Sequence, residues 1–249
     1  MRLILILAAL AVALPVFADN HMDPDADLAD AWYIVVKDGH HEEFEAAFKD
    51  HLKYRKKKRD PRPWKTYAPI IGSDLNHYVI RHCCVSWADM DSYREWAQKA
   101  KTGDHWDENV DPHVAKYKHY MHKIDFENNS WPEDDPGYQL FGVTRWKIKQ
   151  GHGGKVDEIK KMFSDHAKEG GWSRSWAWSS QIGGGDMMSL VTPYMNYADI
   201  KGPAGGFGKF LAGRIGEEAT SKAFADFGMN FHGSSYTVYR LVEDMSMKE

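Results

Sequence analysis

The chain has 249 residues, of which 43% are hydrophobic and 27% are charged. Its formal net charge of −4 at pH 7 offers no general attraction to nucleic acid, which excludes a polyanion as the expected partner. Beyond the amino terminus no apolar run approaches the roughly 20 residues that a membrane-spanning helix needs, and two cysteines are too few for a disulfide-stapled domain.

Residues 1–18 have the form of a secretory signal peptide. Arg2 supplies an early positive charge, residues 3–14 are apolar, and the short side chain of Ala18 ends the segment. We therefore expect cleavage after Ala18 and an exported mature protein, either periplasmic or secreted. Residues 19–31 contain five aspartates and little apolar content, which predicts an acidic flexible leader.

The next part of the chain alternates between two hydrophobic periodicities. Runs rich in β-branched and aromatic residues predict strands, and apolar residues at i, i+3, i+4 and i+7 predict helices. The order is strand, helix, strand, strand, helix, strand. The predicted strands are 32–37, 64–71, 77–86 and about 120–127; helices begin near residues 42 and 90, and an irregular stretch at 101–112 leads into a short helix.

The same order of elements then begins again. Residues 128–139 contain two prolines and an acidic run, which is typical of a linker between units. The predicted elements of the second unit are strands at 140–148, 172–181, 187–194 and 234–243, helices near 156–167 and at 217–227, and a glycine-rich stretch at 202–216.

Short sequence matches indicate that the two units are copies of each other. Ile71-Gly72 matches Ile182-Gly183, and the segment 86–90 (Ser-Trp-Ala-Asp-Met) matches 196–200 (Asn-Tyr-Ala-Asp-Ile). An Asp-His pair also occurs on the first helix of each unit, at 50–51 and at 165–166. The predicted domains are therefore a first repeat at 32–127, the linker at 128–139 and a second repeat at 140–249.

Each repeat is expected to form a four-stranded antiparallel sheet with both helices on one face. Tyr78, Val79 and Ile80 are consecutive large apolar residues in one predicted strand, which indicates that the second face of the sheet is covered as well. The natural cover is the sheet of the other repeat. The fold class is thus α+β, with two ferredoxin-like repeats packed sheet to sheet as a fused pseudo-dimeric barrel.

This element order resembles the dimeric α+β-barrel superfamily in its tandem-repeat form. That superfamily includes cofactor-independent oxygenases, haem-degrading and chlorite-decomposing enzymes, peroxidase-like enzymes, isomerases and stress proteins without assigned chemistry. No member's catalytic motif matches this sequence residue by residue. The resemblance therefore implies the fold and leaves the activity open.

The two cysteines are adjacent. In a strand, the side chains of Cys83 and Cys84 point to opposite faces, so a disulfide between them would need a distorted backbone. The favoured interpretation is one buried and one outward thiol, in preference to a redox or metal role.

Histidines are concentrated in the first repeat. Of the 13 in the chain, ten precede the linker. Imidazole suits proton transfer near neutral pH and ligation of metals or haem iron. No pair has a spacing that specifies a metal, so no metal ligand and no cofactor is assigned. The favoured interpretation is that most of these histidines are half-exposed polar residues.

Aromatic residues are abundant, with 10 Trp, 12 Tyr and 11 Phe. Trp64 and Tyr67 lie on one predicted strand, and Trp176 and Trp178 lie on its counterpart. Aromatic side chains with a few polar groups can wall a small-molecule pocket. They also build ordinary cores, and a core role is favoured for any single ring.

The expected function is that of an exported protein that binds a small apolar or aromatic molecule and oxidises it in a monooxygenase-like reaction. The alternatives are a non-enzymatic ligand-binding or stress-related protein, and haem or metal handling through the histidines of the first repeat. The expected partner is a small molecule, and the oligomeric state does not follow from the sequence.

The site is expected in the first repeat, because its third strand carries Arg81 and His82 where the second repeat has Val191 and Thr192. Arg81 and His82 are the candidate catalytic residues. The alternative is a structural role, in which both residues pair with acidic residues at a barrel rim. The candidate substrate-binding residues are Trp64, Tyr67, His77 and His105.

Overall fold

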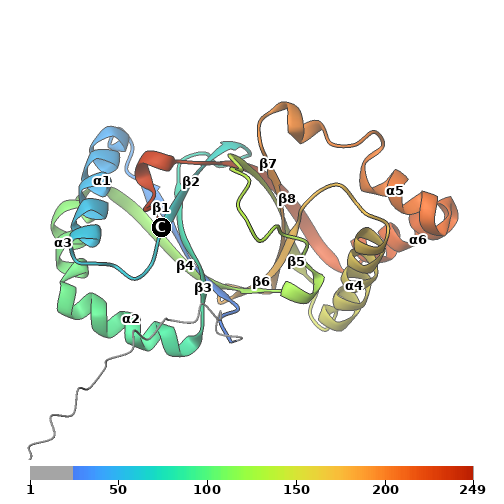
Figure 1. The fold of residues 1–249 in the computed structure, drawn as a ribbon, viewed down its shortest axis with the longest axis horizontal. Helices are drawn as coiled ribbons and strands as arrows, with labels where there is room; N and C mark the ends of the chain where they lie inside the picture. The colour runs from blue at the N-terminus through green and yellow to red at the C-terminus, as the bar shows by residue number, and fades with distance from the viewer. Residues whose placement is uncertain (1–24, 249) are drawn as a thin grey trace, which may run out of the picture.

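The computed structural model describes residues 25–248, which form an eight-stranded barrel with helices on its outside (Figure 1). The signal peptide and the cleavage site predicted after Ala18 lie outside these residues. Within them, no helix is long and apolar enough to cross a membrane.

The elements follow the predicted order in both repeats. The first repeat contains β1 (Leu28–Val36), α1 (His41–Lys57), β2 (Lys65–Ile71), β3 (Tyr78–Val85), α2 (Trp87–Ala100), α3 (Thr102–Asn109) and β4 (Val114–Ile124). The second repeat contains β5 (Leu140–Ile148), α4 (Gly153–Glu169), β6 (Ala177–Ile182), β7 (Met187–Tyr194), α5 (Gly206–Ile215), α6 (Glu217–Gly228) and β8 (Phe231–Leu241).

Several boundaries differ from the predictions; for example, β6 begins at Ala177, where the predicted strand began at residue 172. Strand β1 begins at Leu28, so the last four residues of the predicted flexible leader are buried strand. Helix α3 occupies the stretch that was expected to be irregular, and β4 begins earlier than predicted, at Val114. The glycine-rich stretch contains helix α5, because burial of Leu211 in the helix-side core outweighs the low helix propensity of glycine.

The two first helices show why the sequence folds this way. On α1 the buried residues Phe44, Phe48 and Leu52 recur every four positions, and on α4 Val156, Phe163 and their neighbours form the same kind of stripe. The helices begin 112 residues apart, whereas the two Asp-His pairs are 115 residues apart. The predicted equivalence of those pairs was therefore wrong.

The two sheets close into one barrel. The strand order is β1-β3-β2-β8-β5-β7-β6-β4, so β2 pairs with β8 and β4 pairs with β6 across the two repeats. This confirms the predicted fold class of two βαββαβ repeats with antiparallel sheets. The sheets face each other across the barrel interior and are also hydrogen-bonded along both edges.

Each strand presents alternate residues to the helices and to the barrel interior. The outward residues form one helix-side core per repeat, around Phe44, Phe48 and Ile80 in the first and around Phe163, Trp178 and Met188 in the second. The inward face is more polar than the sequence suggested. On β3, Val79 lies between His77 and Arg81, so the expectation of two apolar faces was wrong there.

The segment after the last strand of each repeat crosses to the other repeat. After β4, the backbone of Ser130 pairs with that of Trp176 in both directions, at 3.0 and 2.9 Å. After β8, the amides of Val242 and Met247 donate to the carbonyls of Thr66 and Trp64. We call residues 125–130 and 242–247 the exchanged tails. The second of them inserts a fully buried residue, Met245, into the first core.

Candidate functional site

The two predicted catalytic residues do not share a site. Arg81 and His82 are neighbours on β3 and therefore point to opposite faces of the sheet. Arg81 lies opposite Ala31 and Lys65 and faces the barrel interior, whereas His82 lies opposite Asp30 beneath the helices. They cannot act together on one small substrate.

The predicted substrate-binding residues divide in the same way. Tyr67 and His77 face the interior with Arg81, and the His77 Nε2 atom lies 3.2 Å from the hydroxyl of Tyr239. Trp64 packs on the helix side, with its ring centroid 6.0 Å from that of His82. His105 lies on α3, and its ring contacts His51 and Tyr54 on α1.

The contacts of His105 are with α1. Its Nδ1 atom lies 3.2 Å from Nδ1 of His51, which is fully buried. Among the described residues, no three His, Cys, Asp or Glu side chains converge to hold a metal ion.

The cysteines also differ from the prediction. Cys83 and Cys84 form a disulfide across a cis peptide bond, so neither is a free thiol. Cys83 pairs with Ala29 and the next paired residue is Val85, which leaves Cys84 as an extra residue in a β-bulge. The prediction assumed regular strand geometry, which the strand does not have at this bulge.

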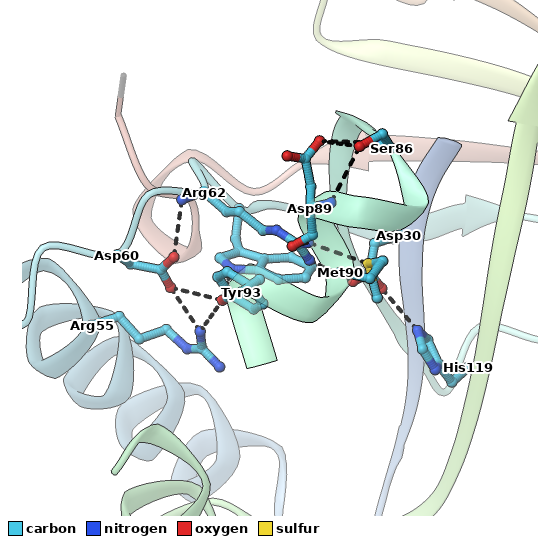
Figure 2. A network of polar contacts seen from close by, with 10 residues as sticks. Asp30, Arg55, Asp60, Arg62, Ser86, Asp89, Met90, Tyr93 and His119 are labelled. Atoms are coloured by element: carbon cyan, nitrogen blue, oxygen red, sulfur yellow. Dashed lines mark hydrogen bonds and ion pairs between the residues drawn. The ribbon is translucent and has the colours of Figure 1, made fainter. Parts of the chain in front are cut away.

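A buried ion pair fills the space between sheet and helices in the first repeat (Figure 2). The Arg62 guanidinium donates to Asp30 at 2.8 Å, and both side chains are only 4% exposed. Asp30 also accepts from His119 at 2.8 Å. The guanidinium lies 3.7 Å from the ring centroid of Tyr93.

A second group of polar contacts joins this one on the side of α1 (Figure 2). Asp60 accepts from Arg55 at 2.7 Å and from the hydroxyl of Tyr93 at 3.1 Å, and Trp64 donates to the same hydroxyl at 3.0 Å. Burial, followed by the charges of Arg62 and Arg81, lowers the pKa of nearby His82 to about 4. We call the contacts of Asp30, Arg55, Asp60, Arg62 and Tyr93 the first-repeat ion network.

The corresponding space of the second repeat contains a cavity. We call it the second-repeat cavity. Its volume is about 240 Å³, slightly below the roughly 300–1,000 Å³ of sites for drug-sized molecules. Most of its wall is aromatic or small: Phe163, Ala167, Trp172, Trp176, Trp178, Tyr194, Gly202, Gly206 and Phe207 contribute, with Ser164, Arg174, Ser175 and Thr192 as polar groups.

Among the described residues that line this cavity, Arg174 is the only cation. It bonds to the Asp199 carboxylate at 3.0 Å and, more closely, to the Asp199 carbonyl oxygen. The guanidinium also lies over the ring of Tyr194, at 5.5 Å. A more open pocket of about 410 Å³ shares Arg174 and Ser175, so the arginine is reached from the surface.

The hydrogen bonds of the aromatic wall fix its shape. The indole of Trp178 donates to Ser164 at 3.1 Å, and that of Trp176 donates to the backbone carbonyl of Asn128 at 2.8 Å. The hydroxyl of Tyr194 lies 3.2 Å from that of Tyr236. With their polar atoms satisfied, the rings present apolar faces to the cavity, which suits a flat aromatic molecule.

The strand registers show how the two spaces correspond. Asp30 pairs with His82 on β3, and Gly142 pairs with Thr192 on β7. Arg62 and Arg174 each lie two residues before the tryptophan that precedes an equivalent strand. The second repeat therefore keeps the arginine and lacks the carboxylate that holds it in the first repeat.

Sequence reasoning placed the site in the first repeat and identified Trp176 and Trp178 only as possible wall residues. It missed Arg174 altogether. The signal was available, because Arg62 and Arg174 stand in the same position of the repeat. The match Asp89 to Asp199 within the repeated segments also pointed to the partner, since Arg62 donates to the carbonyl of Asp89 at 3.5 Å as Arg174 does to that of Asp199.

Comparisons with solved structures find the same fold at low sequence identity. A candidate monooxygenase from Fusobacterium nucleatum subsp. nucleatum ATCC 25586 has a TM-score of 0.57 at 9% identity, covering 88% of this chain and 94% of that one. A chlorite dismutase variant from Candidatus Nitrospira defluvii has a TM-score of 0.53 at 8% identity, covering 88% and 94%. An anthrone oxidase-like protein has a TM-score of 0.51 at 10% identity, covering 88% and 92%.

The chain thus has the dimeric α+β-barrel fold, with both units in one polypeptide. No family model and no curated protein matches its sequence.

Proposed function

We propose that the protein binds a small aromatic molecule in the second-repeat cavity and oxidises it in a monooxygenase-like reaction. The observation that carries the proposal is the aromatic wall with one accessible cation, Arg174. The neighbours described as a candidate monooxygenase and as anthrone oxidase-like support the reaction class, because they have the same fold.

In this proposal the substrate is an aromatic compound with a phenolic or enolic oxygen. Trp176, Trp178 and Phe207 hold the ring system and exclude water from it. The Arg174 guanidinium orients the oxygen and stabilises the negative charge that develops there when the proton passes to solvent through the adjoining open pocket, since a fixed cation in an apolar site interacts strongly with developing charge. Molecular oxygen is the oxidant: one of its atoms enters the substrate, and the other leaves as water with two hydrogens that the substrate loses. Ser175 and Thr192 supply further hydrogen bonds.

Haem, which some proteins of this fold use, does not fit the second-repeat cavity. Protein ligands to haem iron are His, Cys, Met or Tyr side chains. The described residues that line the cavity include no His, Cys or Met, and the hydroxyl of Tyr194 already contacts that of Tyr236. No step of the proposed reaction is assigned to haem.

The test is titration of the mature protein with 1,8-dihydroxyanthrone, followed by quenching of tryptophan fluorescence and by oxygen consumption. We expect Ala167→Phe to abolish the quenching, because the new ring fills the cavity. Arg174→Met should lower the rate of oxygen uptake by about tenfold or more and weaken binding less, since the charge develops during the reaction.

The matched control is Arg214→Met, which removes an exposed arginine that does not line the cavity. It should change neither readout. Binding without oxygen uptake would favour the non-enzymatic alternative. Unchanged quenching in Ala167→Phe would show that the ligand binds elsewhere.

We further propose that the protein is exported, on the basis of its first eighteen residues. Intact mass of the protein recovered outside the cytoplasm tests this. A chain that still begins at Met1 would contradict it.

A further inference from the structure

The barrel interior carries positive charge without acidic residues to balance it. The eight strands contain a single acidic residue, Asp30, and it faces outward to Arg62. Arg81 on β3 and Arg145 on β5 both occupy inward positions, as the registers of these strands with β1 and β8 show. The strands therefore give the barrel interior a positive charge, inside a protein of net negative charge.

Arg145 is held by two tyrosines. Its guanidinium donates to the hydroxyl of Tyr33 at 2.6 Å and to that of Tyr239 at 3.3 Å. It also lies over both rings, at 5.3 and 5.7 Å from their centroids. These contacts fix its position and leave its charge uncompensated.

Arg81 has no such partner. Within residues 25–248, no hydrogen bond, ion pair or cation–π contact joins its guanidinium to another group. Burial lowers the pKa of Arg81, yet its side chain is half-buried and keeps surface that a small molecule can reach. An unpaired guanidinium in such a place is costly unless water or an anion solvates it.

The groups around the two arginines are hydrogen-bond donors. Burial raises the pKa of Tyr33 and of Tyr67, so both hydroxyls stay protonated. Both lie near enough to the Arg81 guanidinium to feel its charge. His122 lies near both arginines, and burial followed by their charges lowers its pKa to about 3, so it adds no further charge.

Two of the described acidic residues approach the interior from exposed positions. Asp135 lies near enough to Tyr67 to act on its pKa, after burial and the charge of Arg81. Asp74, 63% exposed, lies 3.7 Å from the Nδ1 atom of His77. Asp74 does not neutralise Arg81, because Tyr67 and Tyr33 are the groups that act on its guanidinium. It does not neutralise Arg145 either, which is held by Tyr33 and Tyr239.

We propose that the barrel interior binds a small oxyanion, a phosphate or a carboxylate, held by Arg81 and Arg145 with the hydroxyl of Tyr67 as a further donor. Guanidinium groups match the geometry of such oxygens and bond them in pairs. The interior of an eight-stranded barrel is either filled by side chains or holds one small ligand, and the unpaired guanidinium of Arg81 favours a ligand here. This site is separate from the second-repeat cavity, which lies on the other face of the sheet.

The test is isothermal titration of the mature protein with sodium phosphate, sodium acetate and sodium benzoate, each against sodium chloride at matched ionic strength. Saturable binding of at least one of the three is the expected result. A preference for phosphate or for the carboxylates identifies the kind of oxyanion. Heats equal to those of chloride for all three would overturn the proposal.

Two variants locate the binding. Arg81→Met should weaken it by about 10- to 100-fold, the value of a charge-assisted hydrogen bond to a buried ion. Arg240→Met removes an exposed arginine from the helix side of β8 and should leave it unchanged. If both variants weaken binding equally, the anion binds to surface charge and the proposal fails.

A variant that keeps the positive charge at position 81 distinguishes a loss of binding from a loss of the fold. Arg81→Lys retains a cation and loses the paired donors, so it should bind the oxyanion with intermediate affinity. An affinity equal to that of the unmodified protein would contradict the role of Arg81. Because 1,8-dihydroxyanthrone binds in the other site, quenching by it should be the same in all three variants, so the two proposals fail independently.

Discussion

The two repeats use an equivalent arginine in opposite ways. In the first, Asp30 on β1 reaches under the helices and binds Arg62 in a buried pair. In the second, Gly142 stands in the register position of Asp30, and Arg174 turns to Asp199, whose side chain is 36% exposed. The first arginine is therefore held in a buried pair, whereas Arg174, which lines the second-repeat cavity, is held by a partly exposed carboxylate.

A carboxylate cannot be restored at position 142 of the second repeat by a single substitution. A Cβ atom on Gly142 would lie 2.9 Å from the ring of Tyr194 and still closer to the hydroxyl of Tyr236. These two tyrosines occupy the room that a carboxylate would need. In the second repeat, neighbouring side chains thus fill the space of the missing side chain, as expected for a close-packed interior.

The largest expected effect is on stability. Arg62→Leu should lower the free energy of unfolding by about 3–5 kcal/mol, because it leaves the buried carboxylate of Asp30 with only His119 as a partner. Arg174→Leu should cost about 1 kcal/mol or less, because Asp199 is partly solvated. Urea unfolding of both variants measures the difference. Equal losses would mean that the two arginines are not used differently.

Truncation of a buried phenylalanine should lower the free energy of unfolding more in the first repeat, whose core is filled, than in the second repeat, which contains the cavity. Phe44 is fully buried in the first core, so Phe44→Ala should cost about 3–5 kcal/mol. Phe163 already borders the second-repeat cavity and makes fewer contacts on that side, so Phe163→Ala should cost about 2 kcal/mol. Thermal and urea denaturation provide the measurement, and a larger cost for Phe163 would contradict the comparison.

Acid sensitivity should come from the first repeat. Burial, followed by the charges of Arg55 and His105, lowers the pKa of His51 to about 3. The unfolded chain binds this proton near pH 6.5, so the stability that neutral His51 contributes is complete above that pH and is lost as the pH falls toward 3. The loss amounts to about 2 kcal/mol at pH 5.

The variant His51→Gln tests this pH dependence. The free energy of unfolding should fall less between pH 7 and pH 5 in the variant than in the unmodified protein. In the second repeat, Phe163 occupies the position of His51 when the helices are aligned by their first residues, so no equivalent group titrates there. An unchanged pH profile would show that other groups dominate.

The smallest expected effect is at a helix end. Helix α2 begins with a capping box, in which Ser86 accepts from the amide of Asp89 and the Asp89 carboxylate accepts from that of Ser86. Helix α5 begins after Gly205 without a side-chain cap. Ser86→Ala should cost about 1 kcal/mol and leave ligand binding in the second-repeat cavity unchanged. A change in that binding would indicate coupling between the repeats.

Much of the fold was predictable from the sequence, because hydrophobic periodicity and the repeated segments each specify the same order of elements. The separation of Arg81 from His82 was also available, since adjacent strand residues point to opposite faces. The ion pair of Asp30 and Arg62 was not predictable from the sequence. It joins residues 32 positions apart, and Asp30 was part of an acidic segment that resembled a solvated leader.

The cavity illustrates the same limit. Trp176 and Trp178 were recognised as residues that could wall a pocket or fill a core, and the choice depends on what lies opposite them. That is decided by Arg174, Thr192 and helix α5, which come from three separate segments. The stretch 202–216 was described only as glycine-rich, and burial of Leu211 stabilises helix α5 there despite the low helix propensity of glycine.

The exchanged tails have a consequence for the order in which the protein can acquire its structure. The first core is completed by Met245, which lies after β8, the last strand of the barrel. The amino-terminal repeat therefore cannot complete its core until residues 242–247, which follow the last strand of the other repeat, have been made, even though its own strands are synthesised first. The first repeat by itself is thus an incomplete folding unit.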